Sequence, residues 1–260
     1  MNVPFYIARK YFFSSKKINY VHILSLVSQF GIAIGTIALV LVMSVFNGFE
    51  NLVLDMYNVF DPHIRVTSND GKNFDSDQVN KVIGNIDGVA NFSSVLEEKI
   101  LVEYNSKQYI AVIKGVDANY RELTNFDSLI VDGGYIDDFK SNNVAMVGRG
   151  IAYYLSMHIG SVFDNLRVYL PNRDSKNLLK LEKAFTSSSI SPVGVFGVQQ
   201  EIDSKYIIVP LNFVQDLINR DKYVSAIEIK LKSSDSMINI QNILKEKLDS
   251  KYLIQNTLWW

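Results

Sequence analysis

The stretch FGIAIGTIALVLVMSVFNGFE, Phe30 to Glu50, decides how this chain is organised. No formally charged residue lies between Lys17 and Glu50, and the span from Ile23 to Phe46 consists mainly of Ile, Leu, Val and Phe. A helix needs about 20 apolar residues to cross the hydrocarbon core of a bilayer. The sequence therefore predicts a membrane-spanning helix within residues 18–49.

A buried helix of a soluble protein and a cleaved signal peptide are the two alternatives to a membrane span. The apolar region of a signal peptide normally covers about 7 to 15 residues and ends in an A-x-A-like cleavage site. Here the apolar run is longer, and the segment MSVFNGFE that follows contains no such site. A retained membrane span is therefore the favoured interpretation.

Basic residues precede the span, and no acidic residue occurs before Glu50. The positive-inside rule then places the N-terminus in the cytoplasm and the rest of the chain outside, which is the periplasm in a bacterium with two membranes. The segment PFYIARKYFF mixes aromatic and basic residues, as expected for a short helix at the cytoplasmic interface. We therefore expect an interfacial segment over residues 1–17 and a single-pass protein of the inner membrane.

Two features suggest that the spanning helix has protein neighbours. Gly31 and Gly35 form a small-xxx-small pair that allows another helix to approach closely. Residues 50–62 predict a stalk helix that ends at Asp61-Pro62. Its apolar stripe, which rests either on a partner helix or on the chain's own domain, consists of Phe49, Leu52, Val53, Met56, Tyr57 and Phe60.

The exterior part reads as α+β. Strand-helix-strand patterns over 63–118 and 222–260 predict one porter-like subdomain, and residues 119–221 between them predict an inserted α/β subdomain. The expected strands are 63–68, 91–104, 107–117, 143–148, 165–171, 189–198, 205–210, 223–232 and 251–258, and the expected helices are 75–86, 149–157, 211–219 and 236–248. The polar segment 172–189 is long for a connection between strands, and long loops are often functional.

The sequence gives little support for catalysis. It has no cysteine, which removes thiol chemistry and zinc-thiolate sites, and its net charge of −1 gives no global attraction to nucleic acid. The three histidines, His22, His63 and His158, fall in different elements. Asp75 and Asp77 read as a helix cap. Gly148 to Gly150 spell GRG without a complete phosphate-binding loop. We therefore predict no catalytic residue, no metal site, no cofactor and no enzymatic activity.

The segment from Leu24 to Glu50 closely resembles the first transmembrane helix of the LolC/LolE lipoprotein-releasing permeases, with their string G-I-x-x-G-x-x-A-L-V…S-V-x-N-G-F-E. The matching residues are Gly31, Ile32, Gly35, Ala38, Leu39, Val40, Ser44, Val45, Asn47, Gly48, Phe49 and Glu50. The exterior part is similar to the MacB-like periplasmic core domain. VIKGVD, 112–117, looks like its strand end, and 147–171 looks like its next helix and strand, although Ser161 replaces the usual Asp.

This resemblance implies a permease subunit of an ABC transporter that transmits motion from ATP hydrolysis on a separate cytoplasmic ATPase subunit. The implied partners are that ATPase, a second permease subunit of the same or a homologous kind, a lipoprotein cargo and a periplasmic lipoprotein carrier. The family's permeases continue with further transmembrane helices, whereas this chain ends at NTLWW. The resemblance therefore implies a truncated product or a fragment.

The resemblance also implies two sites. The upper end of the first helix lines a lipid-accessible cavity in this family, which here corresponds to Val40, Met43, Phe46, Asn47 and Phe49. Simple helix packing is the alternative role for these residues. A protruding carrier-binding loop of the family corresponds to 172–189, although its sequence does not match closely and an ordinary exposed loop is the alternative. The candidate carrier contacts are Asn172, Arg173, Asp174, Lys176, Leu178 and Leu179.

Three alternatives to lipoprotein release stay open. The chain could serve MacB-like efflux of macrolides or peptides, or it could act as a cell-division permease of the FtsX-like group. It could also be a single-span membrane-tethered binding or sensor domain. The first two differ from lipoprotein release in their partners more than in their fold, and the third would need a cytoplasmic signalling segment, for which the residues before the span are few.

Overall fold

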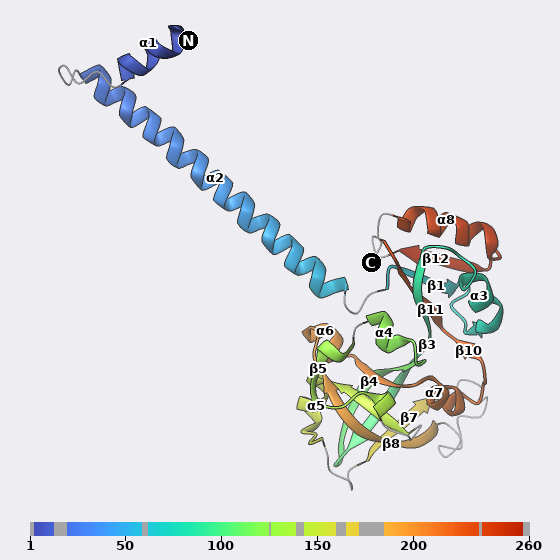
Figure 1. Ribbon diagram of the computed structural model, residues 1–260. Coiled ribbons are helices and arrows are strands. Elements are labelled where there is room, and N and C mark those ends of the chain that lie inside the picture. The colour runs from blue at the N-terminus through green and yellow to red at the C-terminus, as the bar shows by residue number, and fades with distance from the viewer. Residues whose placement is uncertain are drawn as a thin grey trace. The chain divides into compact units, whose positions relative to one another are not determined.

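The computed structural model describes residues 3–12, 20–58, 62–124, 126–138, 143–159, 165–171, 185–233 and 236–256 (Figure 1). The chain divides into two compact units, Met1–Asp55 and Met56–Trp260.

The helices are α1 Val3–Phe12, α2 Tyr20–Asn58, α3 Ser76–Ile83, α4 Tyr120–Thr124, α5 Arg149–Leu155, α6 Gln200–Asp203, α7 Leu211–Ile218 and α8 Met237–Lys247, with the 3-10 turns η1 Phe126–Leu129 and η2 Ile136–Asp138. The strands are β1 Ile64–Ser68, β2 Phe74–Asp75, β3 Val89–Tyr104, β4 Lys107–Val116, β5 Ile130–Gly133, β6 Val144–Gly148, β7 Leu166–Pro171, β8 Phe185–Phe196, β9 Tyr206–Pro210, β10 Tyr223–Val224, β11 Ala226–Leu231 and β12 Tyr252–Asn256.

The first unit is dominated by α2, a continuous helix of 39 residues. Its segment Ile23–Phe49 has a mean hydropathy of 2.2 and is long and apolar enough to cross a membrane. At 1.5 Å per residue the whole helix is about 58 Å long, roughly twice the hydrocarbon thickness of a bilayer. The predicted span and the helical part of the predicted stalk are thus one uninterrupted helix as far as Asn58.

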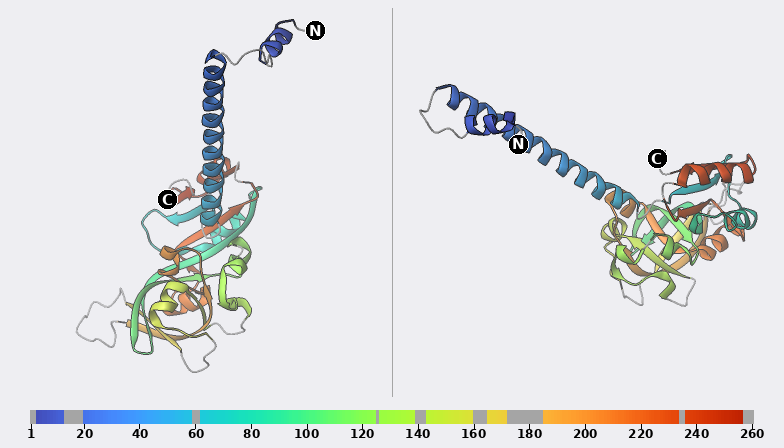
Figure 2. Two further views of the ribbon diagram at one scale, coloured as in Figure 1. Left: turned by 90° about the vertical axis from the view of Figure 1, so that its left-hand side faces the viewer. Right: turned by 45° about the horizontal axis from the view of Figure 1, so that its top comes forward.

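The second unit is built on a ten-stranded mixed sheet. Nine strands follow the order β12-β1-β11-β3-β4-β9-β6-β8-β5, and the tenth, β7, pairs with β3 and β8. The long hairpin of β3 and β4 pairs at ten positions, from Val95↔Val116 to Tyr104↔Lys107. In Figure 2 it extends from the strands β1 and β11 to the strands β7 and β8. The α+β composition expected from the sequence is confirmed.

Three apolar clusters form the core of this unit. Helices α3 and α8 cover β1, β11 and β12, so that Val79 and Leu244 pack with Ile229. Helices α5 and α7 pack on the central strands through residues such as Ile151 and Phe213. The third cluster combines aliphatic side chains with four aromatic rings, which belong to Tyr120, Phe126, Tyr135 and Phe196. The one sheet crosses all three clusters, and a division into two subdomains stays a prediction.

One strand prediction is wrong. The sequence predicts a single strand over residues 223–232, but the structure has two strands there, β10 and β11, separated by Ser225. The backbone N–H of Ser225 donates to the Val95 carbonyl at 2.9 Å, and its hydroxyl accepts from the Glu97 N–H at 2.9 Å. Ser225 therefore turns the chain between two sheets, because β10 pairs with β2 whereas β11 pairs with β1 and β3.

Candidate functional site

The proposed cavity residues lie on α2 and are exposed within the chain. The side chains of Val40, Met43, Phe46 and Phe49 are 57%, 61%, 68% and 63% exposed, and Asn47 is also exposed. At 3.6 residues per turn, Val40, Met43 and Asn47 share one side of the helix, Phe46 adjoins them, and Phe49 lies furthest round. No hydrogen bond to the Asn47 amide is found among the residues that the structure describes.

The other sequence-predicted positions on α2 are equally open. A methyl group placed on Gly31 or Gly35 would meet nothing within 4 Å. Both glycines therefore leave room for a close neighbour along this helix. The side chains of the stalk stripe beyond Phe49, and the whole of residues 59–61, lie outside the described residues.

The proposed carrier-binding residues, Asn172, Arg173, Asp174, Lys176, Leu178 and Leu179, also lie outside the part of the chain that the structure describes. The strands on either side are described: β7 and β8 pair from Leu166↔Ile190 to Pro171↔Phe185. The predicted loop therefore begins at the end of an antiparallel hairpin, and its last five residues, 185–189, belong to β8.

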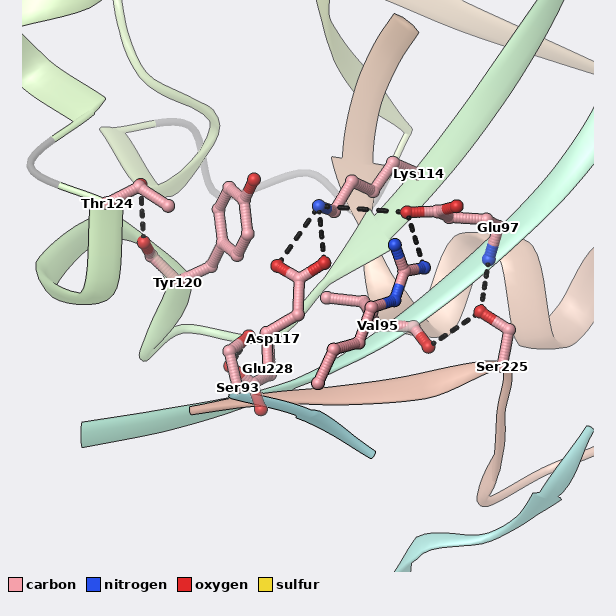
Figure 3. A network of polar contacts seen from close by, with 10 residues as sticks. Ser93, Val95, Glu97, Lys114, Asp117, Tyr120, Thr124, Ser225 and Glu228 are labelled. Carbon is pink, nitrogen blue, oxygen red and sulfur yellow. Dashed lines mark hydrogen bonds and ion pairs between the residues drawn. The ribbon is translucent and has the colours of Figure 1, made fainter. Parts of the chain in front are cut away.

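The domain also holds a buried ion network that sequence reasoning missed (Figure 3). It joins Arg65 of β1, Glu228 of β11, Glu97 of β3 and Lys114 of β4, which are four consecutive strands of the sheet. The ammonium of Lys114 donates to both carboxylate oxygens of Glu228, at 2.8 and 3.0 Å, and lies 3.7 Å from Glu97 Oε1. Arg65 Nη2 lies 3.1 Å from that same Glu97 oxygen.

Each charge of this network is stabilised by an opposite charge beside it. Lys114 and Glu228 are only 2% and 1% exposed. Burial alone would lower the pKa of Lys114, but Glu228, Tyr120 and Glu97 outweigh it and raise the pKa. Burial alone would raise the pKa of Glu97, but Lys114 and Arg65 hold the pKa below its ordinary value. The ion pairs therefore persist over the physiological pH range, since acid is needed to discharge Glu97 and alkali to discharge Lys114.

A small cavity of about 260 Å³ opens beside the network. Arg65, Glu97, Lys114 and Glu228 line it from the sheet, and the other walls are made by Pro62, Gln199, Glu201, Ile202, Lys205 and Tyr206. Its lining includes three acidic and three basic side chains, so its charges compensate one another. The signal in the sequence was a charged residue at a buried position inside each of two mainly apolar strands, Lys114 in AVIKGV and Glu228 in AIEIKL.

Other motifs that the sequence singled out have structural roles. The Asp75 carboxylate accepts from the Asp77 N–H at 2.9 Å and caps α3, as predicted. Asp117, at the end of VIKGVD, accepts from the Ser93 hydroxyl at 2.7 Å and from the Ser94 N–H at 2.8 Å, which ties β4 to β3. Among the described residues, no group of three or more metal-ligating side chains is present.

The GRG sequence serves packing. A side chain on Gly148 would collide with the backbone of Asp203, and one on Gly150 would collide with Ser204. Arg149 Nη2 lies 3.3 Å from Asp203 Oδ2. The two glycines thus allow the region of α6 to lie directly against the start of α5.

The molecule is thus of the class in which a long apolar helix leads into an α+β domain built on a mixed sheet. The family model of the MacB-like periplasmic core domain matches residues 25–247. This match covers most of the chain, and the chain belongs to that family. The match begins inside α2 and ends in α8, so that the apolar helix and the domain are matched together.

Curated relatives include the lipoprotein-releasing system transmembrane protein LolC of Buchnera aphidicola, which is 25% identical over 94% of this chain and 59% of its own length. The corresponding protein LolE of Haemophilus influenzae is 22% identical over 98% of this chain and 61% of its own. The chain therefore spans about three fifths of the length of these relatives.

Two solved structures share the fold at 13% identity. The extracellular domain of the ABC-type transporter YknZ from Gram-positive bacteria superposes with a TM-score of 0.53 over 74% of this chain and 99% of its own. The periplasmic region of MacB from Actinobacillus actinomycetemcomitans gives a TM-score of 0.51 over 74% of this chain and 87% of its own. At this identity the likeness concerns the fold.

Proposed function

We propose that this chain acts as a membrane-embedded permease subunit of an ABC transporter, and that a separate cytoplasmic subunit hydrolyses the ATP. The observation that carries this proposal is the continuous match of an apolar helix and the following domain to one family. The uninterrupted α2 supports it as well, because a helix without a break can transmit displacement from the membrane to the domain. The chain itself supplies no catalytic group in this proposal.

The transported substrate that we propose is a lipoprotein, released from the inner membrane toward a periplasmic carrier. The names of the relatives LolC and LolE support this substrate class. Efflux of the MacB type is the second candidate, favoured by the likeness of the domain to the MacB periplasmic region. The two candidates differ in the partners that must accompany the chain in the membrane.

The proposed orientation places α1 at the cytoplasmic interface and the domain in the periplasm. The described part of α1 combines exposed Phe5, Tyr6 and Ile7 with the basic residues Arg9 and Lys10. Aromatic and basic residues together are suited to the boundary between lipid headgroups and acyl chains. The basic residues before α2 favour the cytoplasmic side.

We further propose that Val40, Met43, Phe46, Asn47 and Phe49 form part of a wall that meets the acyl chains of the cargo. Their open, mainly apolar side chains support this role. In the domain, we propose that 63–118 with 222–260 and the inserted 119–221 act as two subdomains. In that arrangement the loop after β7 would carry the contacts to the carrier.

The experiment is affinity purification of the full chain from its own membranes, followed by mass spectrometry of the bound proteins. A variant with residues 172–184 replaced by a Gly-Ser linker leaves Phe185–Ser189 paired with β7. We expect the ATPase, a second permease and acylated lipoproteins with both forms, and a small periplasmic carrier only with the unaltered chain. The variant Lys72→Met, altered at an exposed site, serves as the control and should retain every partner.

Recovery of the chain without an ATPase or a second permease would contradict the permease proposal. Recovery of a periplasmic adaptor and an outer-membrane channel in place of lipoproteins would favour efflux. If the linker variant still retained the carrier, this result would contradict the proposed role of the loop and leave the permease proposal unaffected.

A further inference from the structure

The cavity beside the ion network has a second wall, which does not belong to the network. The four network residues line the cavity from the sheet, and Figure 3 shows three of them with labels, Glu97, Lys114 and Glu228. The second wall comes from one short stretch, residues 199–206, which contains α6 and the start of β9. We call this stretch the α6 wall, and its lining side chains are Gln199, Glu201, Ile202, Lys205 and Tyr206.

The charges on the sheet side of the cavity are already balanced. Lys114 donates to both carboxylate oxygens of Glu228 and lies 3.7 Å from Glu97 Oε1. Arg65 Nη2 lies 3.1 Å from that same Glu97 oxygen. Two acidic and two basic side chains thus leave no net charge here, so this side needs no bound ion to neutralise it.

Two opposite charges on the α6 wall are open. Glu201 and Lys205 are exposed, and neither forms an ion pair with another residue in the described part of the chain. Side chains four residues apart pair readily on a continuous helix, but α6 ends at Asp203. Lys205 Nζ instead lies 4.8 Å from the centre of the Tyr206 ring. The α6 wall therefore offers one negative and one positive group to a ligand.

Lys205 also lies within electrostatic reach of the network. Burial would raise the pKa of Glu97, but the positive charges of Lys114, Arg65 and Lys205 hold that pKa below its ordinary value. The two open charges of the α6 wall thus adjoin a polar floor that is itself neutral.

The chemistry of the lining excludes several kinds of occupant. A metal cation or a simple anion would be attracted by one open charge and repelled by the other. An apolar molecule would remove water from charged groups without replacing the lost hydrogen bonds. The volume of about 260 Å³ is below the roughly 300–1,000 Å³ of sites for drug-sized ligands. The fitting occupant is therefore small, neutral overall, and charged at both ends.

We propose that this cavity binds a small zwitterion, in which a primary ammonium group and a carboxylate or phosphate group are separated by one or two carbon atoms. Glu201 accepts hydrogen bonds from the ammonium group, and Lys205 donates to the anionic group. Free amino acids and the ethanolamine phosphate headgroup of lipids share this chemistry. Binding does not require the proposed transport function, since every lining residue belongs to the second unit.

The test is isothermal titration calorimetry of the full chain, purified in a non-ionic detergent and dialysed exhaustively. Glycine and O-phosphoethanolamine represent the two sources of the zwitterion. Ethanolamine and acetate each carry only one of the two charges. Phosphocholine carries both charges, but its quaternary ammonium group has no N–H to donate to Glu201.

We expect glycine or O-phosphoethanolamine to bind at one site per chain with a Kd of about 1 mM or tighter. Ethanolamine, acetate and phosphocholine should bind about tenfold more weakly or not at all, because each lacks one charge-assisted hydrogen bond. Tighter binding of O-phosphoethanolamine would identify a lipid headgroup as the source, and tighter binding of glycine a free amino acid. If neither zwitterion bound saturably, or if ethanolamine, acetate or phosphocholine bound equally well, the proposal would be overturned.

Variants of the α6 wall locate the site. Glu201→Gln and Lys205→Met should each weaken the binding about tenfold or more. Both side chains are exposed, so the unfolding midpoint of the ligand-free chain should stay the same. Glu246→Gln and Lys72→Met change exposed residues elsewhere and serve as matched controls with unaltered affinity. Unaltered affinity in Glu201→Gln and Lys205→Met as well would place the binding outside this cavity and overturn the proposal.

Discussion

At the scale of single residues, the central strands of the domain are joined by buried charged side chains that lie within mainly apolar sequences. Lys114 and Glu228 are almost completely buried and depend on each other for solvation. Removing one partner of a buried ion pair leaves an uncompensated charge, whereas replacing both partners by apolar residues can be neutral. The two cases therefore predict different outcomes for single and double substitutions.

Lys114→Met should destabilise the domain by about 3–5 kcal/mol, because the Glu228 carboxylate would lose its main partner. The midpoint of thermal unfolding of the full chain in detergent is measured by circular dichroism. The double variant Lys114→Met/Glu228→Leu should recover part of the loss. Lys72→Met removes a lysine whose side chain is 79% exposed and serves as control. An equal midpoint for Lys114→Met and Lys72→Met would contradict the role of the network.

His63 predicts a dependence of stability on pH. Its Nδ1 accepts the Leu231 N–H at 3.0 Å, and burial, followed by the charge of Lys230, lowers its pKa below the ordinary 6.5. The unfolded chain then takes up a proton on His63 before the folded chain does, so stability is complete above pH 6.5 and falls as the pH drops below it. His63→Gln should flatten this part of the pH profile of the unfolding midpoint. The exposed His158→Gln should leave it unchanged, and equal slopes in all three proteins would refute the prediction.

At the scale of elements, the strands were largely predictable, because alternation and β-branched residues mark β3 and β4 clearly. The short elements α4, α6 and β5 were not predicted, since four or five residues are too few to show a period. The break at Ser225 was also missed because it depends on hydrogen bonds to β3. The ion network could not be predicted for a related reason: it requires β1, β11, β3 and β4 to be neighbours, and strand order is not written in local sequence.

The contact between the start of α5 and the region of α6 gives a prediction about Gly148. Gly148→Ala should destabilise the domain by about 1–3 kcal/mol, because the new methyl group would press on the Asp203 backbone and force the two elements apart. Gly84→Ala is the matched control. Its φ of −62° suits alanine, and the new methyl group would require the Asn80 carbonyl oxygen, 3.3 Å away, to shift by only a few tenths of an ångström. Equal unfolding midpoints for the two variants would show that α6 can move away without cost.

At the scale of the whole molecule, the sequence of the apolar helix was sufficient to predict a span, and the resemblance was sufficient to predict the family. The proposed cavity residues on α2, the cargo and the partners were all named from the resemblance. Their roles stay predictions, because they depend on surfaces contributed by other chains.

The proposed orientation can be tested on spheroplasts, in which the inner membrane is intact. Single cysteines replace Lys72 in the domain and Lys10 in α1, and a membrane-impermeant maleimide is applied to spheroplasts before and after permeabilisation. We expect the cysteine at 72 to react at once and the cysteine at 10 to react only after permeabilisation, because the basic residues before α2 are retained in the cytoplasm. The reverse pattern would invert the topology, and immediate reaction at both sites would argue against a membrane crossing.

The position of β1 in the sheet has a consequence for biosynthesis. β1 lies between β11 and β12, so its two neighbours are separated from it by about 160 and 190 residues of chain. Contacts of such long range form late, since the entropy of closing the intervening loop must first be overcome. Both edges of β1 thus stay unpaired until residues 226–256 have been synthesised. During that interval the unpaired strand edges of the nascent domain favour aggregation.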